Sequence, residues 1–360
     1  MSRRCRVTID LGALRHNFHK VREYATKSRI MVAVKANAYG HGVSEVARAL
    51  DQADAFAVAT LAEALELRAA GIAKTIVLLG GVLDAEELRF AAEHDLQLVV
   101  HDFRQLSLIE ATDCAQTAAI WIKLDTGMHR LGFPPDAVAE VGRQLAGLPG
   151  LRLQGWMTHF ASADETGNPS TSAQIEAFQH AVRGLPGTRS LANSAGIIAW
   201  PDSHADWVRP GIMLYGASPL NGKTAEELGL RPVMTLCSRL LSIRGLPAGE
   251  PVGYGGTWVT PEHMRIGVIA IGYGDGYPRH APGGTPVLIG GRRTQLIGRV
   301  SMDLVTVDLR GCDDAREGDE AILWGDGLPA DEVARHVGTI AYELFCGLSR
   351  RVEYEYRDDG

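Results

Sequence analysis

The sequence predicts an α/β fold in two parts, an N-terminal (β/α)8 TIM-type barrel over residues 1–230 and a mainly β domain over residues 231–360. In the first part, short apolar runs alternate with stretches whose apolar residues recur at helical spacing. In the second part, strand-like runs follow one another and are separated by Gly, Pro and Asn or Asp turns. A chain of 360 residues has the length expected for one large domain and one smaller domain.

Eight apolar runs are the expected barrel strands. Strands that are buried on both faces and alternate with helices are typical of a closed parallel barrel. The last two runs are weakly apolar, so an open doubly wound sheet is the competing architecture. Asp84 precedes the helical stretch AEELRF and is the expected N-cap of that helix. The eight runs are IMVAVK (30–35), AFAVAT (55–60), TIVLLG (75–80), LQLVVH (96–101), AIWIKL (119–124), LQGWMTH (153–159), SLANS (190–194) and DWVRPG (206–211).

The second part of the chain is expected to form mainly β structure, with a helix at PADEVARHV (329–337). The first few residues of the chain could pair with strands of this domain instead of belonging to the barrel. The strand-like runs are LCSRLLSIRGL (236–246), RIGVIAIGY (265–273), GTPVLIGG (284–291), RTQLIGRV (293–300) and DLVTVDL (303–309).

Composition and charge favour a small-molecule partner. Hydrophobic residues make up 46% of the chain and charged residues 22%, which supplies a sizeable core. The net charge of −7 is spread along the chain, with no basic stripe for nucleic acid and no polybasic patch for a membrane.

The cysteines and the N-terminal sequence predict a cytoplasmic protein. The five cysteines are widely spaced and include no CxxC pair, so we expect neither a disulfide framework nor a metal site. The sequence MSRRCRVTID reaches an aspartate before any apolar segment typical of a secretory signal. No apolar run approaches the roughly 18 residues that span a bilayer. The cysteines are Cys5, Cys114, Cys237, Cys312 and Cys346.

Polar and mostly basic residues occupy the ends of the predicted barrel strands, where barrel enzymes carry their chemistry. A lysine that is partly desolvated and close to other cations has a lowered pKa, and its free amine forms Schiff bases with aldehydes. Lys35 is the candidate, and a lysine that merely extends from a strand end to solvent is the alternative. The residues at the strand ends are Lys35, His101, Lys123, His159, Ser194 and Arg209.

The loop after Lys35 and the last two strands point to a phosphate-bearing aldehyde. Asn37, Gly40 and Gly42 permit a tight backbone, and Tyr39 supplies a phenol, whereas His41 is interpreted only as a loop residue. The hydroxyl of Ser194 and the backbone of RPGIMLYG (209–216) are typical of an anion-binding site. Pyridoxal 5′-phosphate is therefore the candidate cofactor.

Eight motifs together resemble those of the alanine racemase family, over the chain from Val7 to its end. The resemblance implies a barrel that binds pyridoxal phosphate, a C-terminal β domain and a head-to-tail homodimer with shared active sites. The motifs are AVKANAYGHG (33–42), KLDTGMHRLGF (123–133), MTHFASAD (157–164), NSAG (193–196), RPGIMLYG (209–216), VGYGGTW (252–258), GYGDGYPR (272–279) and GRVSMDLVTVD (298–308).

The resemblance implies that Lys35 holds the cofactor as an internal aldimine and is one of two catalytic acid/bases, the other being Tyr254 of the partner subunit. Two bases suit a racemisation, since a proton leaves one face of a planar carbanion and returns to the other. A tyrosine with its ordinary pKa of about 10 is a poor base, so His159 and its neighbours would have to lower it. The competing interpretation of Tyr254 is a turn tyrosine that covers an apolar patch.

The resemblance also implies the remaining cofactor and substrate contacts. Arg209 would face the pyridine nitrogen and keep it unprotonated, since a guanidinium retains its proton. Arg130 would bind the cofactor's phenolic oxygen or the substrate carboxylate, and Met302 of the partner subunit would contact that carboxylate through its backbone. Lys123 matches a position that carries a carbamate in many relatives, and His129 is structural. The implied phosphate ligands are Tyr39, Ser194, Gly211, Ile212 and Tyr342, and His159 completes the cofactor-binding set.

Alanine is the substrate that the resemblance favours. Tyr273 and Tyr342 match tyrosines that narrow the access corridor in alanine-selective members, and Asp303 and Arg299 would shape the same corridor. A broader racemase acting on serine or basic amino acids is the first alternative. A non-catalytic pyridoxal phosphate carrier and a decarboxylase on the same barrel are the others, although a carrier lacks the second domain and no decarboxylase motif surrounds Cys312 or Cys346. The implied role is supply of D-alanine, a peptidoglycan precursor, or breakdown of L-alanine.

Overall fold

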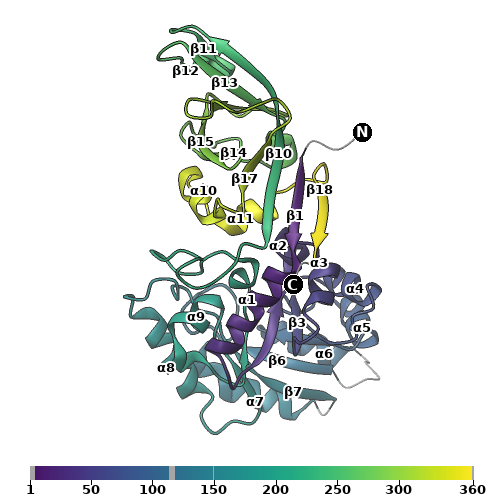
Figure 1. The fold of residues 1–360 in the computed structure, drawn as a ribbon. Coiled ribbons are helices and arrows are strands. Elements are labelled where there is room, and N and C mark those ends of the chain that lie inside the picture. Colours follow the sequence, from purple (N-terminus) through teal and green to yellow (C-terminus); the bar gives the residue numbers. More distant parts are fainter. Residues whose placement is uncertain (1–4, 113–117, 149, 359–360) are drawn as a thin grey trace.

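The computed structural model describes residues 5–112, 118–148 and 150–358, and Cys114 lies outside this set. The chain forms a barrel surrounded by helices and a second unit built on a large β-sheet, which stand end to end (Figure 1). The segment between them runs from the last barrel strand, which ends at Val208, to a long strand that begins at Met234.

Eight parallel strands close the barrel, and each overlaps one of the eight apolar runs, although the strand Thr188–Ser190 shares only Ser190 with its run, SLANS. The closed barrel is therefore confirmed and the open sheet is wrong. Closure depends on the two weakest runs. The last strand has only two residues. Of these, Trp207 pairs with Arg29 of the first barrel strand and with Ser190 of the seventh. The strands are β2 (Arg29–Ala33), β3 (Ala55–Val58), β4 (Thr75–Leu78), β5 (Leu96–Val100), β6 (Ala118–Lys123), β7 (Leu151–Met157), β8 (Thr188–Ser190) and β9 (Trp207–Val208).

Side chains alternate between the inside of the barrel and the helices around it, as the pleat of a strand requires. Along β2, for example, Met31 belongs to the core inside the barrel, while Ile30 and Val32 belong to the core between strands and helices. Trp121 and Trp207 meet edge to face inside, with ring centroids 6.0 Å apart. The barrel interior is therefore packed with side chains, as is usual for this fold.

One barrel helix begins at the capping residue that its sequence predicts. Asp84 accepts hydrogen bonds of 2.9 Å from the N–H groups of Glu86 and Glu87, as expected of the N-cap. The helical segments of this unit are α1 (Leu11–Tyr24), α2 (Lys35–Gly40), α3 (Val43–Ala49), α4 (Leu61–Ala69), α5 (Ala85–Glu93), α6 (Phe103–Ala111), α7 (Val138–Ala146), α8 (Ser170–Ala181) and α9 (Ser194–Ala199), with 3₁₀ turns η1 (Pro135–Ala137), η2 (Pro201–Ser203) and η3 (Ile212–Tyr215).

The second unit contains an eight-stranded sheet in the order β13-β16-β15-β14-β17-β10-β1-β18, and β13 also pairs with β10. The strand at Arg6–Asp10, near the start of the chain, pairs antiparallel with β10 and parallel with β18, so it lies in this sheet. The strands are β1 (Arg6–Asp10), β10 (Met234–Leu246), β13 (Met264–Ile269), β14 (Pro286–Ile289), β15 (Arg292–Ile297), β16 (Val305–Asp308), β17 (Glu320–Trp324) and β18 (Glu353–Arg357).

Two helices of this unit turn back toward the barrel, and the second one packs beside α2. A two-stranded ribbon lies at the opposite end, the part of the unit most distant from the barrel (Figure 1). In the described ranges, no helix is long and apolar enough to cross a bilayer. The remaining elements are α10 (Ala330–Val337), α11 (Ala341–Cys346), β11 (Pro251–Val252), β12 (Trp258–Val259) and the 3₁₀ turns η4 (Tyr254–Gly256) and η5 (Tyr273–Asp275).

Candidate active site

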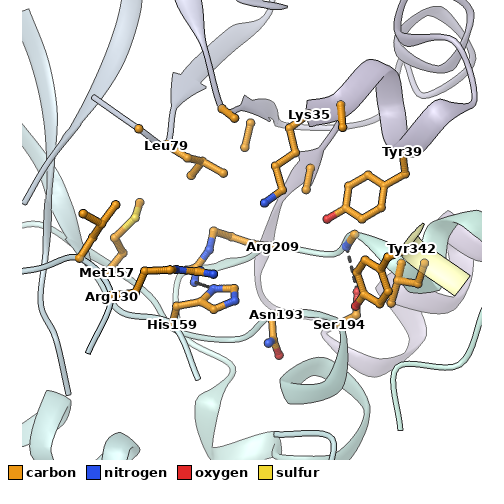
Figure 2. A pocket seen from close by; sticks show the side chains of 18 of the residues that line it. Lys35, Tyr39, Leu79, Arg130, Met157, His159, Asn193, Ser194, Arg209 and Tyr342 are labelled. Carbon is orange, nitrogen blue, oxygen red and sulfur yellow. Dashed lines mark hydrogen bonds between the residues drawn. The ribbon is translucent and has the colours of Figure 1, made fainter. Parts of the chain in front are cut away.

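A cavity of about 490 Å³ opens at the carboxyl ends of the barrel strands. Helix α11 of the second unit supplies part of its wall (Figure 2). Its volume lies in the usual range for small-molecule sites. Ten of the residues that the sequence singles out line it: Lys35, Tyr39, Lys123, Arg130, His159, Ser194, Arg209, Gly211, Ile212 and Tyr342.

Lys35 directs its amine into this cavity from the end of β2 (Figure 2). Burial lowers the pKa of the amine, and the nearby guanidinium of Arg130 lowers it further. The next residue is fixed by a hydrogen bond of 2.7 Å from the N–H of Ala36 to the carboxylate of Glu63, in the first turn of α4. The lysine therefore has the lowered basicity and the fixed backbone that an amine nucleophile requires.

The segment after Lys35 is a single left-handed turn. Ala36, Asn37, Ala38 and Tyr39 have φ angles between 52° and 54°, a conformation that disfavours L-residues by roughly 1–2 kcal/mol each. Tertiary contacts hold the turn: Asn37 Oδ1 accepts from the N–H of Val43 at 2.8 Å, and the Tyr39 ring stacks on Tyr215 with centroids 4.8 Å apart. The turn brings the Tyr39 phenol into the cavity beside Lys35 (Figure 2).

The candidate phosphate site is assembled from the ends of the last two strands. Ser194 Oγ accepts hydrogen bonds from the N–H groups of Gly211, at 2.9 Å, and of Met213, at 3.4 Å. A Cβ at position 211 would lie 2.6 Å from the Tyr39 hydroxyl, so the glycine permits this close approach. Burial raises the pKa of Tyr39 to about 12, which keeps its phenol protonated and able to donate.

Arg209 is buried at the floor of the cavity, with 7% of its surface exposed. Its terminal nitrogens donate to the carbonyls of Ser190, at 2.8 Å, of Leu191, at 3.1 Å, and of Thr158. It also donates to His159 Nδ1 at 3.4 Å, so the imidazole hydrogen belongs on Nε2. Burial and then the charge of Arg209 hold the pKa of His159 well below its ordinary value.

Lys123 and Arg130 add two further basic groups to the cavity wall. Burial, and then the charges of Arg209 and Arg130, lower the pKa of Lys123 to about 8. His129 does not line the cavity and is tied to Asp125, which accepts from its backbone N–H at 3.0 Å. Its expected structural role agrees with this contact.

Five predicted site residues lie elsewhere in the chain. None of them lines the cavity, and all belong to turns of the second unit. Tyr254 is 68% exposed and lies beside the β11–β12 ribbon, at the end most distant from the barrel (Figure 1). The residues are Tyr254, Tyr273, Arg299, Met302 and Asp303.

Tyr273, Met302 and Asp303 nevertheless belong to two adjoining turns. The N–H of Tyr273 donates to the carbonyl of Ser301 at 3.0 Å, and the N–H of Gly274 to that of Met302 at 2.8 Å. Arg351 bridges the two turns through Asp303, at 2.6 Å, and Asp275, at 3.2 Å. These two turns therefore form one exposed edge.

The cavity also contains a thiol that the sequence reasoning did not assign. Cys346 lines it together with Tyr342, four residues earlier on α11. Residues four apart on a helix share one face, so the spacing of Tyr342 and Cys346 could have identified this thiol from the sequence. In the part of the chain that the structure describes, the cysteines are free thiols, and no group of three or more His, Cys, Asp or Glu residues is suited to hold a metal.

The chemistry of these groups fits pyridoxal phosphate. A desolvated amine can hold an aldehyde, and a hydroxyl with nearby turns can hold a phosphate. A permanently charged guanidinium, that of Arg209, lines the same cavity and is hydrogen-bonded to a neutral imidazole.

Comparison with family models matches both units of the chain. The model described as alanine racemase, N-terminal domain, matches residues 9–219, and the model described as alanine racemase, C-terminal domain, matches residues 233–356. Curated relatives named alanine racemase include one from Halorhodospira halophila, 52% identical over 99% of this chain and 98% of its own length. Another, from Nitrosococcus oceani, is 53% identical over 96% of this chain and 97% of its own.

Solved structures resemble the whole chain as well. The biosynthetic alanine racemase from Pseudomonas aeruginosa superposes with a TM-score of 0.96 at 47% identity, covering 99% of this chain and 100% of its own. The alanine racemase from Bartonella henselae, a structure with covalently bound pyridoxal phosphate, has a TM-score of 0.89 at 30% identity and covers 98% and 99%.

Proposed function

Because the chain belongs to the alanine racemase family, we propose that it interconverts L-alanine and D-alanine by a two-base mechanism, with pyridoxal 5′-phosphate bound in the barrel cavity. The observation that carries the proposal is Lys35, a desolvated amine among cationic neighbours at the mouth of the barrel. When bound, the cofactor supplies an electron sink that acidifies the α-proton of the amino acid.

The residues of the cavity have distinct roles in holding the cofactor. Lys35 would hold the aldehyde end, and Tyr39, Ser194 and the turn at Gly211 and Ile212 would hold the phosphate with Tyr342. Arg130 would bind the phenolic oxygen or the substrate carboxylate. This assignment is supported by the cavity itself, which brings these side chains together from five separate segments.

Arg209 and His159 would control where the proton returns. A guanidinium keeps its proton at any physiological pH, so the pyridine nitrogen opposite it would accept a hydrogen bond and stay unprotonated. An unprotonated ring is a weaker electron sink, which favours protonation at the α-carbon and disfavours transamination. The three carbonyls that bind Arg209 hold it in place for this role.

Racemisation requires one base on each face of the α-carbon. Lys35 would exchange the proton on one face, and Tyr254 of the partner subunit on the other. Two observations support a shared site. The Tyr254 side chain is exposed at the end of the second unit that is most distant from the barrel. Met302 is also exposed, in the turn that adjoins the turn at Tyr273. A head-to-tail homodimer would cover this edge and complete the cavity.

Lys123 would carry a carbamate. Formation of a carbamate consumes a neutral amine, and a pKa of about 8 makes that form available near neutral pH. The modification would replace a positive charge beside Arg130 with a negative one, which removes a repulsion and orients the guanidinium. Mass spectrometry under native conditions, or ¹³C NMR with labelled bicarbonate, would detect it.

The substrate is expected to be alanine, with Tyr342 from one subunit and Tyr273, Arg299 and Asp303 from the other narrowing the access corridor. A pyridoxal phosphate carrier lacks a second domain, whereas residues 233–356 of this chain match the C-terminal domain model. This match argues against the carrier alternative. The free thiols agree with a reducing compartment, and a cytoplasmic location stays a prediction.

The test is proton NMR of L-alanine and of D-alanine incubated in D₂O with the protein and pyridoxal phosphate, together with a chiral assay of the products. Loss of the α-proton signal with formation of the opposite enantiomer is the expected result. Exchange from serine, lysine or arginine, but not from alanine, would replace alanine with the broader racemase. Bound cofactor without exchange from any amino acid would contradict the proposal.

A further inference from the structure

A buried histidine closes the left-handed turn that separates Lys35 from Tyr39. His41 has no exposed surface and follows the turn directly. Its Nδ1 lies 2.8 Å from the carbonyl of Tyr39 and 3.2 Å from that of Ala38. A carbonyl accepts and does not donate, so Nδ1 carries the hydrogen, and the imidazole is bonded to the last two residues of the turn.

The rest of the ring is enclosed by aromatic side chains. It lies against Tyr215, with centroids 4.6 Å apart, and meets Phe345 edge to face at 5.0 Å. Tyr215 in turn stacks on Tyr39. His41 Nε2 is buried and has no hydrogen-bond partner in the described part of the chain. Packing alone would be served by an apolar ring, so the feature that distinguishes histidine here is the Nδ1 donor.

The backbone around His41 is closely packed. The N–H of His41 itself donates to the carbonyl of Ala38 at 3.1 Å, so the shorter bond to the carbonyl of Tyr39 is the one that the imidazole adds. Gly40 and Gly42 flank it at φ angles of +78° and +90°. A Cβ on Gly40 would lie 2.1 Å from the carbonyl of Phe345, and one on Gly42 would lie 1.9 Å from the Tyr356 hydroxyl. The chain is therefore pressed against α11 and β18 on both sides of the histidine, and the imidazole is enclosed with the turn.

We propose that His41 is a positioning residue for the cofactor site: its Nδ1–H fixes the left-handed turn and thereby sets the Tyr39 phenol relative to the Lys35 amine. The inference rests on the proposed function, because it concerns how the cavity holds pyridoxal phosphate. Burial lowers the pKa of His41 to about 4, so the ring is neutral and keeps this donor throughout the physiological range.

Two substitutions of His41 distinguish the effect of its Nδ1–H donor from the effect of its ring packing. His41→Phe keeps an aromatic ring against Tyr215 and Phe345 but removes the donor. His41→Asn removes most of the ring but keeps an N–H at the same bond separation from Cβ. His204→Phe is the matched control, since His204 Nε2 lies 2.8 Å from the carbonyl of Ile197 and outside the cavity.

The experiment is a titration of pyridoxal phosphate into each full-length apoprotein, followed by absorbance, with thermal unfolding of the same samples. We expect His41→Phe to raise the dissociation constant about ten-fold, the effect of one buried hydrogen bond. His41→Asn should stay within about three-fold of the unsubstituted protein although it unfolds at a lower temperature, and His204→Phe should bind as the unsubstituted protein does. If His41→Phe is recovered unfolded, His41→Leu takes its place.

Three results would overturn the inference: unchanged affinity in His41→Phe, equal weakening in His41→Asn and His41→Phe, or equal weakening in His204→Phe. Each would show that the donor does not set the site. Failure of the unsubstituted protein to bind pyridoxal phosphate is a different outcome, and it would overturn the proposed function and this inference with it.

Discussion

At the scale of single residues, two side chains from distant parts of the sequence carry the proposed chemistry. Lys35→Ala should abolish the absorbance of lysine-bound cofactor and lower kcat by more than about 10³-fold, because both the attachment point and one base are lost.

Tyr254→Phe should keep that absorbance and lower racemisation by roughly 10²–10⁴-fold, with α-proton exchange from one enantiomer affected more than from the other. Absorbance spectra and exchange in D₂O measure both. Normal racemisation by Tyr254→Phe would exclude the two-base assignment.

Lys123 gives the protein a pH-dependent stability of definite sign. Its pKa is about 8 in the folded chain, against an ordinary value of 10.5. Between these values the unfolded chain binds more protons than the folded chain, so the contribution of Lys123 to the free energy of unfolding rises with pH across this window. Below pH 8 both states are protonated and the contribution is constant.

Urea unfolding of the unsubstituted protein and of Lys123→Met, in carbonate-free buffer, measures this effect. The unsubstituted protein should gain stability relative to Lys123→Met from pH 8 toward pH 10. Lys27→Met, at an exposed lysine, is the control and should show no such change. A constant difference between the unsubstituted protein and Lys123→Met over this range would show that the amine is not desolvated.

At the scale of secondary-structure elements, the start of α4 fixes the backbone beside Lys35. Glu63 is the third residue of that helix and completes a capping box with Thr60. Its carboxylate also accepts from the N–H groups of Ala36 and Ala59, both at 2.7 Å. One side chain therefore joins the ends of β2 and β3 at the cavity.

Glu63→Ala should lower the free energy of unfolding by about 1–3 kcal/mol, because it leaves several backbone donors without a partner. It should also weaken binding of pyridoxal phosphate, since Ala36 follows Lys35. Glu66→Ala, on the exposed face of the same helix, should change neither. Chemical unfolding and cofactor titration measure the two effects, and equal behaviour of the two variants would contradict the role of Glu63.

At the scale of the whole molecule, the cavity lies where the barrel meets the second unit, whereas the exposed Tyr254 lies beside the β11–β12 ribbon, at the end of the second unit most distant from the barrel. If the site is shared between subunits, inactive Lys35→Ala and inactive Tyr254→Phe should complement each other. After mixing, unfolding and refolding, half of the dimers are mixed and one of their two sites is intact, so about a quarter of the unsubstituted activity should return.

An assay of racemisation before and after refolding measures the complementation, and each variant refolded alone is the control. Activity that stays absent in the mixture, while the unsubstituted protein regains its own after the same treatment, would show that Lys35 and Tyr254 do not meet across a subunit interface.

The amino-acid sequence by itself determined the closed barrel and the basic residues at its strand ends. Apolar periodicity is local, so even β9, with two residues, was identifiable from the run DWVRPG. Similarity to the alanine racemases added the proposed roles of Arg209, Tyr342 and Tyr254, which no local pattern indicates. Strands such as β17 and β18, which follow no such motif, emerged only in the sheet.

Only the tertiary structure decided how the loop after Lys35 is built. Left-handed φ angles at Ala36 and Ala38 run against the preference of these residues, because contacts from α4, α11 and β18 outweigh it. For the same reason His41, which the sequence places in a loop, is fully buried, and Cys346 lines the same cavity as Lys35, which lies more than 300 residues earlier in the chain. Local preference is a property of neighbouring residues, whereas strain, burial and pKa depend on which distant segments fold against them.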